Sequence, residues 1–461
     1  MYLIKSISGI RGVIGGMYNN NFTPQDIVEC TAAFGTWVLQ KQPKNATIVI
    51  GRDARISGEL VSGLVANTLR MLGIHVVDLG LSTTPTVEMA VPMLQAVAGI
   101  ILTASHNPKQ WNALKFLNDK GEFISPEDGQ KVLDILSKNE MRYAEVDTLG
   151  AYKQDDTMIA KHIEAILKLP LVAVSAIREK QYKVVVDCIN STGAISVVPL
   201  LEQLGCSVVA IHANMHGNFA HNPEPLPEHL TDLATAVKEQ QAGLGIVVDP
   251  DVDRLAFMCE DGSFFGEEYT LVAVADYVLS KQSGAAVSNL SSSQALRDVA
   301  QRHGCAYHSA AVGEVNVVNK MKATEAVIGG EGNGGVILPA LHYGRDSLVG
   351  VALFLSLLAE KNMTVSALRK TYPEYVIVKD KIQLTPTVNV DHVLEQMKYK
   401  YKAENINTID GLKIDFGKCW VHLRKSNTEP IIRVYAESAN ADEAKALADT
   451  IKKEALLLAG L

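Results

Sequence analysis

Cysteine is scarce in this chain of 461 residues, and its spacing argues against a cysteine-bound metal site. The six cysteines are scattered along the sequence, and no CxxC pair is present. A zinc site built on cysteine needs such closely spaced pairs. Most of the six lie among apolar residues, where free thiols are usually buried. We therefore expect reduced cysteines and a cytoplasmic protein.

Long hydrophobic runs and an excess of positive charge are also lacking. No segment approaches the roughly 18 apolar residues of a membrane-spanning helix. The first residues, MYLIKSISGIRG, lack the extended apolar region of a secretory signal. The formal net charge is −8, whereas nucleic-acid-binding proteins usually carry a basic face. We expect no membrane or nucleic-acid partner, and a monomer or homodimer that acts on small molecules.

The segments that are present alternate between strand-like and helix-like patterns, which predicts an α/β fold. A chain of 461 residues is long enough for several domains, since about 100–200 residues per domain is usual. Towards the C-terminus the strands look antiparallel, which is typical of an α+β domain. We predict three α/β domains and one α+β domain, with bounds at 1–152, 153–255, 256–372 and 373–461.

Residues 103–108 (TASHNP) follow an apolar run at 97–102 that is typical of a buried parallel strand. Open α/β sheets bind ligands outside the carboxyl ends of their strands. Ser105 is therefore a candidate nucleophile or carrier of a phosphoryl group. Because Ser, Asn and Pro also favour caps and turns, these residues alone leave a purely structural role open. His106 is either catalytic or a hydrogen-bonded supporting residue.

The segment DPDVDR places Asp249, Asp251 and Asp253 directly after the apolar run LGIVV. Alternate residues of an extended chain point to one side, so the three carboxylates are predicted to form a magnesium site. An EF-hand is excluded because Arg254 stands where that loop requires glycine. Three acids at the end of a buried strand need a counter-charge, which a cation and Arg254 supply.

Two further loops carry groups that suit a sugar phosphate. Residues 330–335 (GEGNGG) match the dinucleotide pattern GxGxxG, but Pro339 follows where a helix should begin. A loop that presents Glu331 and Asn333 to sugar hydroxyls fits better, with a plain turn as the alternative. Residues 424–430 (RKSNTEP) are either a phosphate-binding loop or a charged hairpin turn. The candidate phosphate ligands there are Arg424, Ser426, Asn427, Thr428 and Arg433.

The motifs GIRG, TASHNP, DPDVDR, GEGNGG and RKSNTEP, in this order, resemble the α-D-phosphohexomutase superfamily over essentially the full chain. Its members interconvert hexose 6-phosphates and hexose 1-phosphates and act on glucose, mannose or glucosamine phosphates. The resemblance implies three related α/β domains with mixed sheets and a C-terminal α+β domain, arranged around a central cleft.

The resemblance also implies roles for individual residues. Ser105 corresponds to the family's phosphoserine, and it binds Mg²⁺ together with Asp249, Asp251 and Asp253. Hexose 1,6-bisphosphate is the expected activator. The residues expected around the transferring phosphoryl group are Arg11, His106, Lys115 and Arg254. Glu331 and Asn333 fall in the sugar-recognition loop, and RKSNTEP falls in the loop that binds the substrate phosphate.

The chain departs from the family pattern near the sugar. The sugar loop often reads GEMSG or GEQSG followed by His, whereas this chain has Asn333 and Gly335, and Glu314 stands where some relatives carry a second His. The GEGNGG form is closer to archaeal-type phosphoglucosamine mutases, so we expect glucosamine 6-phosphate as the substrate. Glucose or mannose phosphates are the alternative substrates. A magnesium-dependent sugar-phosphate phosphatase and a non-enzymatic sugar-phosphate-binding protein stay open as other classes.

Overall fold

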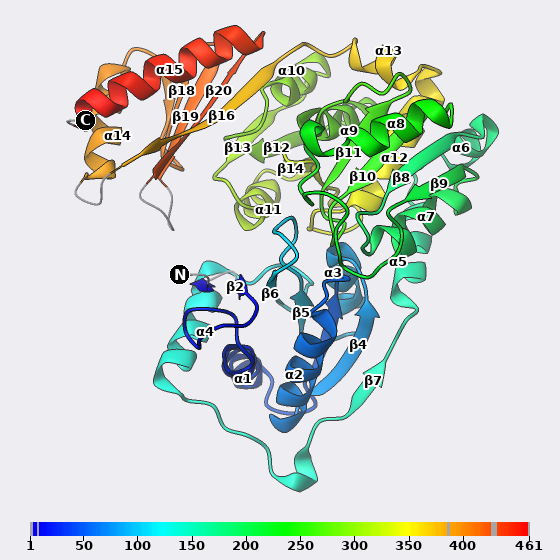
Figure 1. Ribbon diagram of the computed structural model, residues 1–461, viewed down its shortest axis with the longest axis vertical. Helices are drawn as coiled ribbons and strands as arrows, with labels where there is room; N and C mark the ends of the chain where they lie inside the picture. The colour runs from blue at the N-terminus through cyan, green and yellow to red at the C-terminus, as the bar shows by residue number, and fades with distance from the viewer. Residues whose placement is uncertain (1–2, 7–8, 385–387, 426–430, 460–461) are drawn as a thin grey trace.

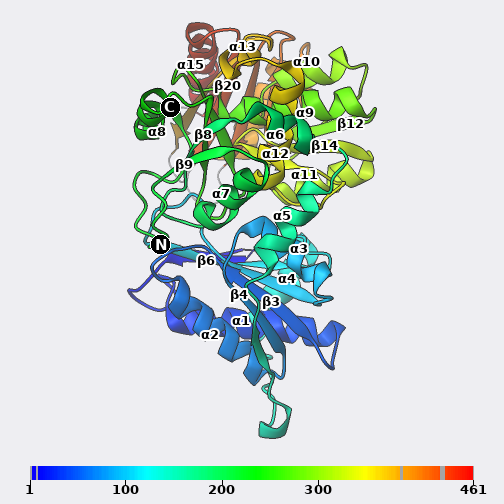
Figure 2. The ribbon, with the colours of Figure 1, turned by 90° about the vertical axis from the view of Figure 1, so that its right-hand side faces the viewer.

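Four β-sheets follow one another along the chain in the computed structural model, which describes residues 3–6, 9–384, 388–425 and 431–459. The sheets lie along an arc, with the N-terminal and C-terminal domains at its two ends (Figure 1). From the side, the first domain lies below the other three (Figure 2). The first three sheets are mixed and the fourth is antiparallel. This architecture confirms the predicted fold class.

The first sheet has seven strands in the order β1-β2-β6-β5-β3-β4-β7. The strands are β1 Leu3–Ser6, β2 Gly9–Val13, β3 Thr47–Arg52, β4 His75–Leu81, β5 Ala98–Leu102, β6 Trp111–Leu117 and β7 Tyr152–Gln154. The helices are α1 Pro24–Lys41, α2 Gly58–Met71, α3 Thr84–Met93 and α4 Pro126–Lys138, followed by a 3₁₀ turn, η1 Val146–Thr148. Every residue of β5 is buried, as its apolar sequence predicts for a central strand.

The second sheet has the order β11-β10-β8-β9. Its strands are β8 Lys183–Asp187, β9 Ser207–Ile211, β10 Leu244–Val248 and β11 Leu255–Cys259. Its helices are α5 Met158–Leu167, α6 Val174–Lys180, α7 Gly193–Gln203 and α8 Thr231–Glu239, with a 3₁₀ turn at η2 Pro227–His229. Strand β10 runs parallel to β8 and antiparallel to β11, so the chain reverses directly after β10. The DPDVDR segment forms this reversal.

The third sheet has the order β13-β12-β14-β15. Its strands are β12 Ala285–Asn289, β13 Tyr307–Ala310, β14 Ala326–Glu331 and β15 Gly335–Ile337. Its helices are α9 Glu267–Lys281, α10 Ala295–Arg302, α11 Glu314–Ala323, α12 Ser347–Lys361 and α13 Val365–Arg369. Helix α12 packs into a core that the second and third domains share. In the described part of the chain, no helix is long and apolar enough to cross a membrane.

The fourth sheet is antiparallel throughout, in the order β16-β20-β19-β18-β17. Its strands are β16 Val376–Gln383, β17 Asn405–Asn407, β18 Leu412–Asp415, β19 Trp420–Lys425 and β20 Ile431–Ser438. Helices α14 Val390–Lys400 and α15 Ala441–Leu458 complete this domain, which has an apolar core of its own. A separate core means that the domain can move without disturbing the packing of the other three.

Two strands lie across the domain bounds that we expected from the sequence. Strand β7 pairs with β4 of the first sheet, and β11 pairs with β10 of the second sheet. A domain should keep its sheet intact, because the ladder hydrogen bonds and the core fold together. We therefore propose divisions after Gln154 and after Cys259, and keep the division before residue 373.

Candidate active site

The loop that carries Ser105 leaves the carboxyl end of β5 in a strained conformation. Ser105 has a φ of 48°, in the left-handed region that costs a residue with a side chain on the order of 1–3 kcal/mol. Its backbone N–H donates to Thr103 Oγ1 at 2.9 Å, and Thr103 Oγ1 donates to Asp53 Oδ2 at 2.6 Å. Such strain persists only where the surrounding structure holds the chain in place.

A buried guanidinium, that of Arg55, holds this loop. Its side chain is 1% exposed, and its Nε donates to Asp53 Oδ2 at 3.0 Å. The remaining N–H groups donate to the carbonyl oxygens of Ser105, Asn107, Pro108 and Trp111. Arg55 was not predicted from the sequence, because in GRDARISGE nothing distinguishes it from a surface arginine.

Asp249, Asp251 and Asp253 lie in the tight reversal between β10 and β11. Our expectation of an extended segment is therefore wrong, since Val252 has a φ of 62° and the chain turns at 250–252. The carboxylates nevertheless converge: their oxygen atoms lie within 4.8 Å of one another, and all three side chains are fully buried. Ser105 Oγ donates to Asp249 Oδ2 at 2.7 Å. The turn, and not strand alternation, brings the predicted serine and carboxylates together.

The chemistry of this group suits a divalent cation. Asp251 Oδ1 and Asp253 Oδ1 are buried and have no hydrogen-bond partner among the described residues. Burial and the neighbouring carboxylates raise the pKa of Asp249 well above its ordinary value. Oxygen-only ligands with uncompensated negative charge are the set that Mg²⁺ prefers. The residues present therefore fit the predicted magnesium site.

Two side chains of the first domain contact this carboxylate group. Lys115 Nζ lies 2.9 Å from Asp251 Oδ2 and 3.8 Å from Asp253 Oδ2. Thr84 Oγ1, at the start of α3, donates to Asp251 Oδ2 at 2.6 Å. Burial opposes both charges, but the attraction between them lowers the pKa of Asp251 and raises the pKa of Lys115. Thr84 was not predicted, because its TTPT context is typical of an ordinary helix start.

His106 and Arg254, both predicted from the sequence, lie beside the same group. His106 Nδ1 is buried and has no hydrogen-bond partner in the part of the chain described. Burial and the positive charges of Arg254 and Arg345 lower the pKa of His106 to about 3. Arg254 Nη1 lies 3.3 Å from Glu224 Oε1, which orients the guanidinium. The His106 imidazole is therefore uncharged at neutral pH.

The predicted phosphate-binding arginines come from opposite ends of the chain. Arg11 is exposed on β2, while Arg424 and Arg433 are register partners on β19 and β20. Arg424 Nε lies 2.8 Å from Asp410 Oδ2, which also accepts from the backbone N–H of Val312 at 2.9 Å. Arg424 is thereby connected to the third domain. The other predicted phosphate ligands, Ser426, Asn427 and Thr428, lie outside the described residues.

The GEGNGG segment forms the turn of the β14–β15 hairpin, which excludes the helix that a dinucleotide fingerprint requires. Glu331 Oε1 accepts from Asn289 Nδ2 at 2.9 Å and from the backbone N–H of Gly313 at 3.1 Å. Asn333 Oδ1 is buried without a described hydrogen-bond partner. Gly334 has a φ of 88°, and a Cβ there would lie 2.2 Å from the carbonyl oxygen of Leu255. Glycine at position 334 therefore lets the GEGNGG turn pack against β11, the strand that directly follows the DPDVDR segment.

Arg345, which was not predicted from the sequence, connects the GEGNGG turn to the DPDVDR turn. Its Nη2 donates to Asp253 Oδ2 at 2.7 Å and its Nη1 to Glu331 Oε2 at 3.1 Å. Its Nε donates to Glu314 Oε2 at 3.0 Å. Although burial opposes its charge, these carboxylates raise the pKa of Arg345. Glu314, at the position where some relatives carry histidine, thus forms an ion pair with Arg345.

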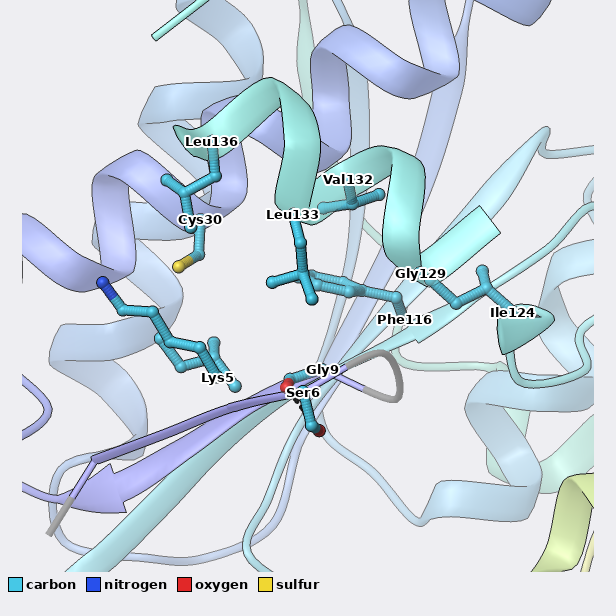
Figure 3. A pocket seen from close by; sticks show the side chains of 11 residues that line it. Lys5, Ser6, Gly9, Cys30, Phe116, Ile124, Gly129, Val132, Leu133 and Leu136 are labelled. Carbon is cyan, nitrogen blue, oxygen red and sulfur yellow. Dashed lines mark hydrogen bonds between the residues drawn. The ribbon is translucent and has the colours of Figure 1, made fainter. Parts of the chain in front are cut away.

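A small pocket in the first domain, drawn in Figure 3, is lined by none of the predicted site residues. Its lining is mostly apolar and includes Cys30 of α1, Phe116 of β6 and Leu133 of α4, with Lys5 at one side. The lining contains neither a carboxylate nor an arginine. This pocket therefore offers no carboxylate for a metal ion or for sugar hydroxyls.

Comparison with known families identifies the chain. Four models match in order: phosphoglucomutase/phosphomannomutase α/β/α domain I at 4–143, domain II at 160–262, domain III at 266–375 and the C-terminal domain at 375–454. The chain belongs to the phosphoglucomutase/phosphomannomutase family. It is therefore a phosphohexomutase, an isomerase that acts by intramolecular phosphoryl transfer, as the sequence motifs indicated.

Relatives within the family are named for different substrate sugars. A phosphoglucomutase/phosphomannomutase of Thermococcus kodakarensis is 33% identical over 95% of this chain and 95% of its own length. A probable phosphoglucosamine mutase of Methanopyrus kandleri is 31% identical over 96% and 95%. A phosphoglucosamine/phosphogalactosamine mutase of Sulfurisphaera tokodaii is 31% identical over 96% and 97%. The family relationship thus extends over the full chain.

Solved structures of the family share the fold. A phosphoglucomutase/phosphomannomutase family protein from Burkholderia thailandensis superposes with a TM-score of 0.86 at 25% identity, covering 99% of this chain and 97% of that one. A protein of Thermus thermophilus, described as a phosphomannomutase by similarity, gives a TM-score of 0.83 at 24% identity over 98% and 99%. The arrangement of all four domains is therefore a family property.

Proposed function

We propose that this phosphohexomutase converts glucosamine 6-phosphate to glucosamine 1-phosphate through a phosphoserine at Ser105 and a hexose 1,6-bisphosphate. One observation carries the proposal: Ser105 Oγ contacts Asp249 beside buried, unpartnered oxygens of Asp251 and Asp253. Phosphoryl transfer depends mainly on positioning and charge neutralisation. A serine bound to a carboxylate cluster that suits a cation provides both.

Each group around Ser105 has a separate role in the proposed phosphoryl transfer. Ser105 and the three aspartates would hold Mg²⁺, which shields the charge of the phosphoryl oxygens when it is bound. Lys115 is held in place by Asp251 and stabilises the charge that develops during transfer. His106 and Lys115, which both lie beside the aspartate group, are the two candidates for accepting the proton of the attacking hydroxyl. Arg11 and Arg254 bind the phosphoryl oxygens.

Both phosphates of the intermediate must reach Ser105 in turn, so the bisphosphate has to rotate by about half a turn in the site. The sugar loop must then accept the hexose in two orientations. A carboxylate such as Glu331 can accept from the 3- and 4-hydroxyls in either orientation, and Asn333 Oδ1 is available as a second acceptor. The distal phosphate is bound by the fourth domain, whose proposed ligands are Arg424, Arg433, Ser426, Asn427 and Thr428.

The choice of glucosamine is supported by the GEGNGG loop and by two of the relatives, which are named for glucosamine phosphates. A relative of similar identity is named for glucose and mannose phosphates instead. Conversion of glucose 1-phosphate and mannose 1-phosphate is therefore the second candidate function. The three sugars differ at C2: glucosamine carries an amine there, whereas glucose and mannose carry a hydroxyl in opposite configurations.

A coupled mutase assay with Mg²⁺ and hexose 1,6-bisphosphate tests the proposal with three parallel substrates: glucosamine 6-phosphate, glucose 1-phosphate and mannose 1-phosphate. We expect kcat/KM to be at least ~100-fold higher for the glucosamine phosphate, equivalent to about 2.7 kcal/mol. Comparable values on all three would support the second candidate. Release of inorganic phosphate as fast as isomerisation would contradict both and indicate a phosphatase.

A further inference from the structure

A second group of metal-ligating side chains lies in the second domain and has no part in the proposed reaction. Asp187, fully buried, is the last residue of β8, and His212 directly follows the neighbouring parallel strand β9. His221 reaches the same point from the loop that follows. His212 Nδ1 lies 3.1 Å from Asp187 Oδ1, and His221 Nε2 lies 3.0 Å from Asp187 Oδ2.

The outer nitrogen of each imidazole also faces an acceptor. His221 Nδ1 lies 2.7 Å from the carbonyl oxygen of Asn222, and His212 Nε2 lies 3.4 Å from Asp232 Oδ2. Without a cation, the inner nitrogens are hydrogen-bonded to the Asp187 carboxylate. A neutral imidazole has one N–H. With that hydrogen on the outer nitrogen, where Asn222 and Asp232 can accept it, the inner nitrogen is able to bind a cation beside Asp187.

We propose that Asp187, His212 and His221 bind a zinc ion. Two imidazoles and one carboxylate suit zinc, whereas Mg²⁺ prefers oxygen ligands alone. Zinc bonds are about 2.0–2.2 Å long, and the ligand atoms already lie within 4.8 Å of one another. Metal-bound histidines usually donate their other N–H to a carbonyl or carboxylate, as Asn222 and Asp232 permit here. The His212 side chain is 21% exposed, which leaves a route for the ion and a position for water.

The bound zinc would anchor a loop that packs against the Ser105 segment. Between the two histidines, Gly217 packs so closely on Ala54 that a Cβ would lie 1.9 Å from the Ala54 carbonyl oxygen. Asn218 Oδ1 accepts from Lys109 Nζ at 2.6 Å, and the Phe219 ring lies 5.1 Å from the Arg55 guanidinium. The zinc ion is therefore a structural brace between the first and second domains.

Zinc content measured by elemental analysis tests the site. The full-length protein is stripped of metal, loaded with Zn²⁺ in the presence of excess Mg²⁺, and dialysed. We expect one zinc per chain in the wild type, and none in His212→Gln or His221→Gln. His229→Gln is the matched control from the same loop and should retain the zinc. Asp251→Asn should also retain it, which separates this site from the aspartate group of the proposed reaction.

Two further measurements keep the test decisive if a ligand variant folds poorly. Asp232→Asn removes only an outer partner, and we expect at least about 10-fold weaker zinc binding from it. Cobalt(II) in place of zinc should give visible absorption bands in the wild type that disappear in His221→Gln. Equal zinc content and equal spectra in the wild type and the histidine variants would overturn the proposal, and the cluster would then be a hydrogen-bonded support only.

Discussion

A single guanidinium holds the Ser105 loop in its left-handed turn. Arg55 donates to the carbonyl oxygens of Ser105 and Asn107 through one nitrogen and to those of Pro108 and Trp111 through another. Lysine has no such planar fork, because its ammonium is a point charge on a flexible stem. The position of the proposed nucleophile therefore depends on a buried residue outside the predicted site.

Replacing Arg55 with lysine should impair turnover more than binding. We expect kcat to fall about 100-fold, since displacement of a reacting group by about 1 Å can cost that much, while KM changes little. Arg52→Lys is the matched control, because among the described residues the Arg52 guanidinium makes a single long hydrogen bond, of 3.4 Å, to the Asp53 carbonyl oxygen. Steady-state kinetics on both variants check this prediction. Equal losses in the two variants would count against a positioning role for Arg55.

Replacing Ser105 with alanine should remove nearly all mutase activity while the protein stays folded. The hydroxyl makes a hydrogen bond to Asp249, whose net contribution to stability is only about 1 kcal/mol. The mutase assay and thermal unfolding measure the two effects separately. Ser137→Ala, in an exposed part of α4, is the control. Wild-type turnover in Ser105→Ala would refute the phosphoserine role.

At the level of elements, the strands of the fourth domain dock on the third domain through polar contacts. Lys413 Nζ of β18 donates to the carbonyl oxygen of Leu290 at 2.7 Å, and Arg297 Nη1 of α10 lies 2.9 Å from Asp415 Oδ2. His422 of β19 contacts Ser291 Oγ at 2.9 Å. A polar interface of this kind is typical of domains that move relative to one another.

The pKa of His422 makes this docking sensitive to pH. Its Nε2 donates to the carbonyl oxygen of Asp410 at 2.6 Å, and its side chain is buried. Burial and the charges of Lys413 and Arg424 lower the pKa of His422 from 6.5 to about 4. The unfolded chain therefore binds the proton first, so the stabilisation is complete above about pH 6.5 and is lost as the pH falls toward 4.

Urea unfolding between pH 5 and 7.5 checks this expectation. Below pH 6.5, the free energy of unfolding should fall by up to about 1.4 kcal/mol per pH unit because of His422. His422→Gln should remove this part of the pH dependence. His392→Gln, an exposed histidine of α14, should leave it unchanged. The same slope in His422→Gln as in the wild type would show that another group titrates.

At the scale of the whole molecule, charges from three domains meet at the DPDVDR turn between β10 and β11. Lys115 comes from the first domain, Asp253 from the second and Arg345 from the third. The second and third domains also share an apolar core. A cation bound at this point would therefore stabilise the packing of three domains at once.

Removal and return of Mg²⁺ should change the stability of the entire protein. After treatment with a chelator, Mg²⁺ at 100 times its Kd should raise the free energy of unfolding by about 2.7 kcal/mol, since it binds only the folded state. Calorimetry at increasing Mg²⁺ concentration measures this shift. In Asp251→Asn the shift should be largely lost. A shift of full size in that variant would place the magnesium site elsewhere.

The parts of the site that lie within single motifs were predictable from the sequence. Ser105 follows a buried apolar strand, and the three aspartates follow another, so local pattern alone placed both at strand ends. Periodicity of apolar residues reports burial directly, which is why these features were correct.

The long-range contacts of the site were decided by the tertiary structure. Arg345 meets Asp253 across 92 positions of sequence, and His221 meets Asp187 across 34. The left-handed backbone at Ser105 and Val252 also has no signature in the residue pattern. The sequence by itself determined the family, the fold class and the reactive motifs, because these depend on local order along the chain. The packing of distant strands decided that charges such as Arg345 and Asp253 meet, because the two residues lie in different loops of the chain.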